Sequence, residues 1–190
     1  ALNRVTGSTS PSQIFGKLSA TNGGEIYLIN ANGILFGRGA QVNTGSLVAS
    51  ALNISDAEFL SGLTNSLLYT WQTPAFKYDG APEDFIDSKN LVRVEEGASL
   101  VTANGGRVFL FAKRVDNAGS ISTPGGQTVL AGGGEVYLQS PSTLALYASE
   151  SNPDVPVLRG LLVEVGAGPA TGPKGAHGSV ANAATGVIST

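Results

Sequence analysis

The chain has 190 residues, a net charge of −3, 26 glycines and no cysteine, and only 13% of its residues are charged. This length suits one domain with a sizeable core, or a short solenoid. Lys and Arg are scattered, so no basic stripe indicates a nucleic-acid partner, and no apolar run reaches the roughly 18 residues of a membrane-spanning helix. Abundant Gly with scarce Glu, Lys, Arg and Gln favours short strands joined by tight turns over long helices.

The first clear strand covers residues 25–29, with the sequence Glu-Ile-Tyr-Leu-Ile. Successive side chains of a strand point to opposite faces, so Ile26 and Leu28 are predicted to face the interior and Tyr27 the outside. Residues 107–111, Arg-Val-Phe-Leu-Phe, repeat this pattern. Both segments follow a Gly-Gly pair, which is typical of a turn that leads into a strand.

Residues 53–62 predict a short helix. Ser55 and Glu58 have the spacing of a capping box, in which side chains satisfy the free backbone N–H groups of the first turn. Gly62 can adopt the left-handed conformation that ends a helix.

Residues 63–90 depart from the strand pattern and predict an excursion, with a hairpin that turns at Asp79-Gly80. This segment carries the aromatic residues Tyr69, Trp71, Phe76, Tyr78 and Phe85. The favoured interpretation is that these rings pack against the flank of the main structure. A ligand-binding platform formed by Tyr69, Trp71 and Tyr78 is the alternative.

A repeat with an offset of 20 residues lays residues 100–110 over 120–130 and pairs Val101 with Ile121. The last five residues of the chain echo residues 119–123. About 20 residues is the length of one turn of a β-helix, in which equivalent strands stack about 4.8 Å apart as parallel sheets. An antiparallel sandwich with accidental similarity is the alternative fold.

Residues 141–160 contain three prolines and predict a loop excursion. Strands of the earlier kind are predicted to resume at Leu161-Leu-Val-Glu-Val165. The predicted organisation is one β-helix domain over residues 1–140 with an excursion at 63–90, then the loop at 141–160 and continuing coils over 161–190.

The most informative segment is Ile29-Asn-Ala-Asn-Gly-Ile-Leu-Phe-Gly, with Gly-Ser-Leu-Val-Ala-Ser at 45–50. It resembles the Asn-Pro-Asn-Gly-Ile signature, and the residues that follow it, of the two-partner-secretion domains of filamentous-haemagglutinin-type exoproteins. Residues 1–7 with 11–14, residues 52–60 and residues 97–133 resemble the flanking segments of such domains. The similarity covers about residues 1–140, in the family's order.

Two features differ from the family pattern. Ala31 stands where the signature usually has Pro, whereas Asn30, Asn32, Gly33 and Ile34 are in place. A second motif, Asn-Pro-Asn-Leu, and the capping strands before the signature are absent, so the chain is expected to lack the N-terminal part of the domain.

The signature also has a physical interpretation of its own. Asn and Gly suit tight turns, and Asn side chains can satisfy backbone groups at a corner. The signature is therefore interpreted as a structural corner that acts on export through folding rather than by direct contact.

The resemblance implies a right-handed single-stranded parallel β-helix with extra-helical hairpin or loop excursions and one short helix. It also implies a non-enzymatic secretion domain, without a cofactor, that directs an adhesin-like exoprotein of a Gram-negative bacterium through the periplasm to the cell surface or medium. The implied partner is an outer-membrane β-barrel transporter with periplasmic polypeptide-binding domains. Folding of the exoprotein would nucleate on this domain.

Two other functional classes fit parts of the sequence. A β-helix enzyme of the pectate-lyase kind needs clustered Asp for calcium and a basic residue for proton abstraction, but Glu83-Asp84 and Glu95-Glu96 resemble solvated turns. The sequence has one histidine, His177, and no cysteine, so it contains few of the residues from which catalytic triads and zinc sites are built. The alternative function is a structural or adhesive β-helix that binds a host glycan or protein, or associates end to end into fibres.

Overall fold

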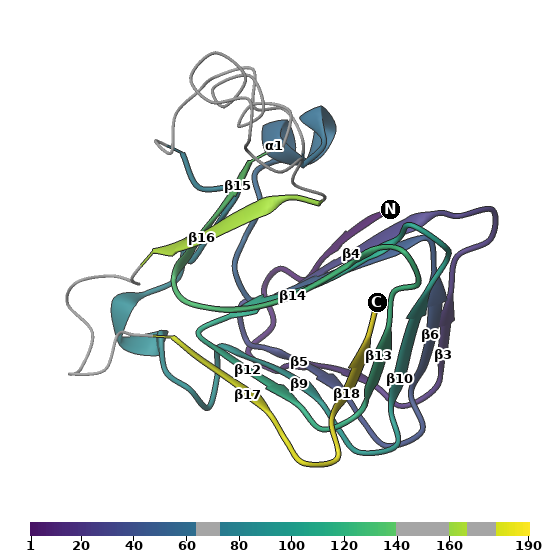
Figure 1. The fold of residues 1–190 in the computed structure, drawn as a ribbon. Helices are drawn as coiled ribbons and strands as arrows, with labels where there is room; N and C mark the ends of the chain where they lie inside the picture. Colours follow the sequence, from purple (N-terminus) through teal and green to yellow (C-terminus); the bar gives the residue numbers. More distant parts are fainter. Residues whose placement is uncertain (64–72, 140–159, 167–177) are drawn as a thin grey trace, which may run out of the picture.

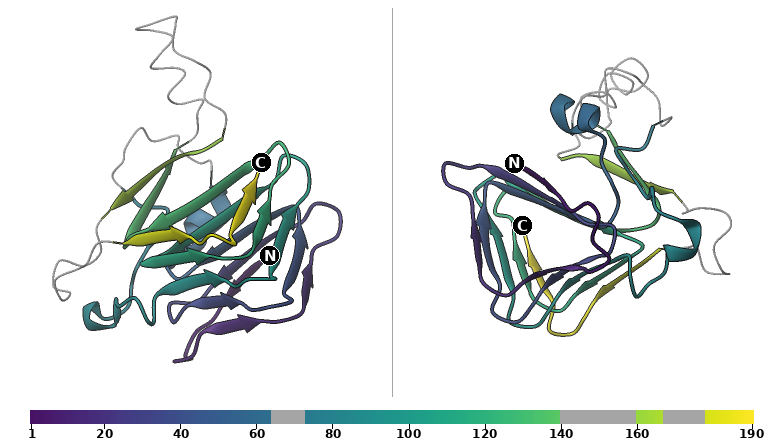
Figure 2. Two further views of the ribbon diagram at one scale, coloured as in Figure 1. Left: turned by 60° about the horizontal axis from the view of Figure 1, so that its bottom comes forward. Right: turned by 180° about the vertical axis from the view of Figure 1, so that it is seen from behind.

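The computed structural model describes residues 1–63, 73–139, 160–166 and 178–190. Three parallel sheets, A, B and C, form the sides of a triangular coil, and a smaller sheet D stands outside it (Figure 1). Figure 2 shows the coils stacked along one axis, from the purple N-terminal coil to the yellow C-terminal coil. Within the described ranges, the chain passes through sheets A, B and C five times in the same order.

Among the described residues, each of the three sheets contains five strands in parallel register. Sheet A contains β1 (Leu2–Arg4), β4 (Glu25–Ile29), β7 (Ser46–Ser50), β11 (Arg107–Ala112) and β14 (Gln127–Gly132). Sheet B contains β2 (Ser12–Ile14), β5 (Ile34–Phe36), β9 (Leu91–Val94), β12 (Arg114–Asn117) and β17 (Ser179–Asn182). Sheet C contains β3 (Lys17–Ser19), β6 (Gln41–Thr44), β10 (Ser99–Thr102), β13 (Ser120–Ser122) and β18 (Val187–Ser189). The predicted parallel β-helix is confirmed.

The first hydrophobic core fills the interior of the coil. The register stacks Ile26 on Leu47 and Leu47 on Val108, and all three side chains are buried. Leu28 is partly buried against the same core, so the predicted inward face of residues 25–29 is confirmed. Each added coil extends this core because equivalent side chains of successive coils contact each other.

The sequence repeat is confirmed in sheet A and shifted by one residue in sheet C. Leu110 pairs with Leu130 as predicted, but Ile121 pairs with Leu100 and not with Val101. Leu100 is fully buried in the core, whereas Val101 is partly exposed. The predicted pairing of Val101 is wrong because the connection from β13 to β14 is one residue shorter than the connection from β10 to β11. A slip of one residue moves a side chain to the opposite face of the sheet.

Two excursions leave the β-helix at the corner between sheets A and B. The first follows β7 and contains α1 (Asp56–Ser61), β8 (Phe76–Lys77) and the 3-10 helix η1 (Pro82–Asp84). The second follows β14 and contains β15 (Glu135–Gln139) and β16 (Leu162–Gly166). Sheet D consists of β8, β15 and β16, and β15 pairs antiparallel with both neighbours.

The predicted helix is confirmed. The Ser55 hydroxyl accepts a hydrogen bond from the Glu58 N–H at 3.1 Å, and Gly62 ends the helix with a φ of 72°. These two caps satisfy backbone groups that the short helix would otherwise leave unpaired.

Two other predictions about the excursions are wrong. The hairpin at Asp79-Gly80 is not formed, because β8 pairs with β15 of the second excursion. The coil predicted to resume at Leu161-Leu-Val-Glu-Val165 is not a coil, because β16 lies in sheet D, while β17 and β18 are coil strands. Apolar residues at alternate positions fit an antiparallel strand as well as a coil strand, so the pattern could not distinguish them. The loop predicted at 141–160 falls almost entirely outside the described residues.

A second hydrophobic core lies on the outer face of sheet A, under the excursions. Tyr27 points outward from β4, yet it is only 5% exposed because α1 covers it. Its ring lies edge-on to Phe59, with 5.1 Å between the centroids. The predicted packing of the excursion's aromatic rings against the flank is confirmed for the described residues Phe76, Tyr78 and Phe85.

Candidate functional site: the corner between sheets A and B

Residues 30–33 of the signature form the tight turn between β4 and β5. The Gly33 N–H donates to the Asn30 carbonyl at 2.9 Å, which closes the turn. Gly33 has a φ of 101°, in the region that favours glycine. A Cβ at this position would lie 2.7 Å from the carbonyl oxygens of Lys89 and Leu91 in the next coil, so the turn also requires glycine for space.

The Asn30 side chain is 1% exposed and hydrogen-bonded at both ends. Its nitrogen donates to the Ser10 carbonyl at 3.1 Å and to the Ser12 hydroxyl at 3.0 Å, both in the previous coil. Its oxygen accepts from the Asn32 N–H at 2.9 Å. Asn30 therefore joins the corner of its own coil to the corner of the coil before it.

The other signature residues contribute differently. Asn32 is partly buried, and its side-chain nitrogen donates to the Ser8 carbonyl at 2.7 Å. Ile34 is 1% exposed and belongs to the inner core. Ala31, in the place where the family usually has Pro, offers its carbonyl to the side chain of Asn90 at 3.3 Å.

Asn90, which no sequence pattern singled out, occupies the same corner one coil later. Its side chain is fully buried, and its nitrogen donates to the Ala51 carbonyl at 2.8 Å. Its oxygen accepts from the Lys113 N–H, in the following coil, at 2.6 Å. Asn90 lies two residues before Val92, just as Asn32 lies two residues before Ile34, and the register pairs Val92 with Ile34. This shared position relative to the strand is the signal that could have identified Asn90.

Asn30 and Asn90 form a column of buried polar groups at this corner, and Lys113 extends the column by one coil. Lys113 also bonds to the end of the first excursion. Its side chain is 6% exposed, and its Nζ lies 3.4 Å from the Asp87 carboxylate. The same ammonium group donates to the Phe85 carbonyl at 3.0 Å and lies 5.3 Å from the centre of the Phe85 ring. These partners offset the cost of burying a charge.

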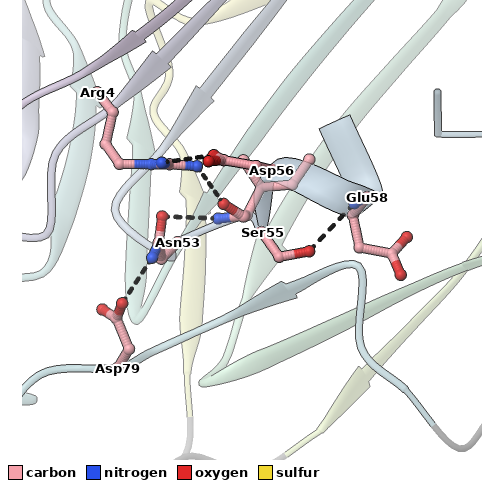
Figure 3. Close-up of polar contacts among 7 residues, drawn as sticks. Arg4, Asn53, Ser55, Asp56, Glu58 and Asp79 are labelled. Atoms are coloured by element: carbon pink, nitrogen blue, oxygen red, sulfur yellow. Dashed lines mark hydrogen bonds and ion pairs between the residues drawn. The ribbon is translucent and has the colours of Figure 1, made fainter. Parts of the chain in front are cut away.

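A second polar cluster connects the first strand to α1 (Figure 3). Arg4 of β1 donates to the Asp56 carboxylate at 2.8 Å and also to the Ile54 carbonyl. Asn53 donates to the Asp79 carboxylate at 2.6 Å and accepts from the Ile54 N–H at 3.0 Å. The cluster links β1 to the residues before α1, and these to the residues after β8.

Tyr78, one of three aromatic residues considered for ligand binding, is only 7% exposed. Its hydroxyl donates to the Ala81 carbonyl at 3.1 Å. Burial, more than the nearby carboxylates, raises the pKa of Tyr78 above its ordinary value. Tyr69 and Trp71 lie outside the described residues, so the platform of three aromatic rings stays a prediction.

A surface groove of about 530 Å³ lies over β9 and β12 on the outside of sheet B. Its charged lining residues are Arg38, Arg93, Arg114, Glu95, Glu96 and Asp116. Asp116 accepts from Arg93 at 3.0 Å and from Arg114 at 2.9 Å, and Arg38 lies 3.6 Å from Glu96. Positive and negative groups balance, and the apolar lining is small or buried, so the groove offers neither net charge for a polyanion nor an anchor for a protein.

Among the residues that the structure describes, no three His, Cys, Asp or Glu side chains are grouped to hold a metal ion. The helices in the described ranges are all too short or too polar to cross a bilayer. His177 lies outside these ranges. What the corner provides is a column of amide, carbonyl and ammonium groups that bonds successive coils to one another and to the first excursion.

Comparison with known proteins gives two results. The family model described as the TPS secretion domain matches residues 1–189. Two curated proteins of Haemophilus influenzae, each named heme/hemopexin-binding protein, are similar to part of the chain. One is 41% identical over 73 residues, which are 38% of this chain and 7% of that protein. The other, from the Rd strain, is 44% identical over 54 residues, which are 28% of this chain and 6% of that protein.

Proposed function

The chain belongs to the TPS secretion domain family, which matches residues 1–189, and we propose that it directs a larger exoprotein through a partner transporter in the outer membrane of a Gram-negative bacterium. The partner is a β-barrel whose periplasmic domains bind the polypeptide before it crosses. The family is one of secretion domains and not of enzymes. The relatives are named for binding heme and hemopexin, but the match covers at most 7% of them, so the proposal is limited to secretion.

The domain promotes export by folding. Each coil that emerges outside the cell stacks on the previous one and buries apolar surface, which contributes about 25 cal/mol per Å². Folding beyond the membrane is then downhill and opposes the return of the chain.

The observation that supports a folding role for the signature is the burial of Asn30, which is 1% exposed and bonded to the preceding coil. These bonds join two successive coils, so the signature is proposed to act on export by making the coils stack.

The test is secretion of the tagged chain with its native upstream segment, in cells with and without the cognate transporter. Asn30→Ala/Asn32→Ala is compared with the wild type and with Asn43→Ala, which changes an exposed asparagine of β6. We expect the wild type and Asn43→Ala to reach the medium only with the transporter. The double variant should lose both export and the circular dichroism spectrum of the native protein.

Two outcomes contradict the proposal at different levels. If the double variant folds normally when purified but is not exported, the transporter recognises the signature directly and the folding role is wrong. If the wild type reaches the medium equally well without the transporter, while a periplasmic marker is retained, the secretion function is wrong. A structural or adhesive role of the β-helix would then replace it.

A further inference from the structure

The first excursion leaves the stack after β7 and contacts the coils on both sides of that strand. Its α1 half packs on an early coil, where Phe59 lies against Tyr27 of β4. Its β8 half packs on a late coil, where Phe76 lies 5.0 Å from Phe111 of β11 between ring centroids. The excursion therefore runs along the outer face of sheet A and joins strands that do not pair with each other directly.

The β8 half is completed only by the second excursion. In sheet D, Phe76 pairs with Val136 and Lys77 pairs with Glu135. Phe76 and Val136 are both 0% exposed. The Lys77 ammonium lies 3.3 Å from the Glu135 carboxylate at the more exposed end of this contact.

The packing of β8 places its contact with β15 late in folding. Six coil strands, β9 to β14, lie between β8 and β15 in the chain. Phe76 and Val136 are no farther apart in sequence than Ala49 and Leu110, which pair β7 with β11, so loop length does not set the order of these contacts. The order follows from the packing, because the surface that buries Phe76 consists of β11 of the coil stack and β15 of the second excursion, and both must be in place first.

We propose that sheet D is a clasp: the coils stack first, and the pairing of β8 with β15 then closes over sheet A and slows unfolding. Interactions that form after the folding transition state lower the unfolding rate and leave the folding rate nearly unchanged. The clasp goes beyond the secretion function, because it concerns the folding of this chain and holds with or without a transporter.

The test compares two buried valines in folding kinetics across a range of urea concentrations. Val136 lies in the clasp and Val115 lies in β12 of the inner core, and both are 0% exposed. We expect Val136→Ala to unfold about tenfold faster and to fold within about twofold of the wild-type rate. Val115→Ala should instead slow folding, because the inner core is already packed in the transition state.

A cross-link gives a second measurement that does not depend on a destabilised variant. The chain has no cysteine, so Lys77→Cys/Glu135→Cys can form only one intramolecular disulfide. Directly opposed residues of an antiparallel pair have a suitable separation for this bond. The oxidised variant should unfold more slowly than the reduced one, while Lys77→Cys alone should not respond to oxidant. The clasp is wrong if Val136→Ala slows folding as much as Val115→Ala, or if oxidation leaves the unfolding rate unchanged.

Discussion

Replacement of Asn90 by alanine tests whether the polar column at the corner holds the coils together. The side chain is fully buried and donates to the carbonyls of Ala51 at 2.8 Å and Ala31 at 3.3 Å. It also accepts from the Lys113 N–H at 2.6 Å. Asn90→Ala removes all three hydrogen bonds and leaves backbone groups of three coils without these partners.

The expected loss of stability follows from the cost of leaving a buried backbone group unpaired, which is about 1–3 kcal/mol for each group. The Ala51 carbonyl and the Lys113 N–H make the two shorter bonds and dominate the effect. We therefore expect the free energy of unfolding to fall by about 3–5 kcal/mol. Water that enters the vacated space would move the value toward the lower end of this range.

The assay is urea-induced unfolding followed by circular dichroism. Asn43→Ala is the matched control, because Asn43 is an exposed strand residue and its change is expected to stay within about 0.5 kcal/mol. An unchanged slope of unfolding free energy against urea shows that a shifted midpoint reports stability and not a different unfolded state.

A loss below about 1 kcal/mol for Asn90→Ala would refute the argument, since buried groups left unpaired cost at least that much. Stacking would then depend on strand pairing and apolar burial alone. Equal losses in Asn90→Ala and Asn43→Ala would have the same meaning, because burial is the feature that distinguishes the two residues.

Three further variants test other parts of the structure. Gly33→Ala places a side chain at a φ of 101° against two carbonyl oxygens, and should cost about 2–4 kcal/mol in urea unfolding. Gly7→Ala, at a φ of 73° in open space, should cost less, and an equal loss would contradict the steric explanation. Burial, more than neighbouring charge, raises the pKa of Tyr27 from 10.0 to about 12, so the folded state favours the neutral phenol. Its contribution, about 3 kcal/mol at most, is present below pH 10 and is lost as the pH rises toward 12. Tyr27→Phe should therefore show a weaker fall in stability over this range, and an unchanged fall would place its cause elsewhere. Arg4→Gln removes a partly exposed ion pair with Asp56 and should cost about 0.5–1 kcal/mol in the same urea assay. A loss above about 2 kcal/mol would show that the cluster does more than pair charges.

Features whose physical cause lies within a few residues could be predicted from the sequence. The alternation in residues 25–29 assigns an inner and an outer face because adjacent side chains of a strand diverge. Ser55 and Gly62 mark the ends of α1 because caps act on backbone groups one to three residues away. The turn at 30–33 uses the positive φ that glycine tolerates at Gly33, whereas Asn30 and Asn32 contribute side-chain hydrogen bonds.

The parallel β-helix and the membership of the secretion-domain family were also predictable, because the coil repeats and the signature is contiguous in the sequence. A repeat of about 20 residues specifies which strands stack, even without knowledge of their exact register. The one-residue error at Val101 shows the limit of this signal, since a shortened turn shifts the register without changing the composition of the strand.

The tertiary structure alone decided which excursions meet. The residues of β8 and β16 have patterns that suit a hairpin or a coil, but both strands pair with β15, because the two excursions leave from the same corner. The burial of Tyr27 depends on α1 of the first excursion, and the role of Asn90 depends on partners from other coils. A sequence pattern states which way a side chain points from its own strand. What covers that side chain, or bonds to it, is determined by segments that only folding brings near.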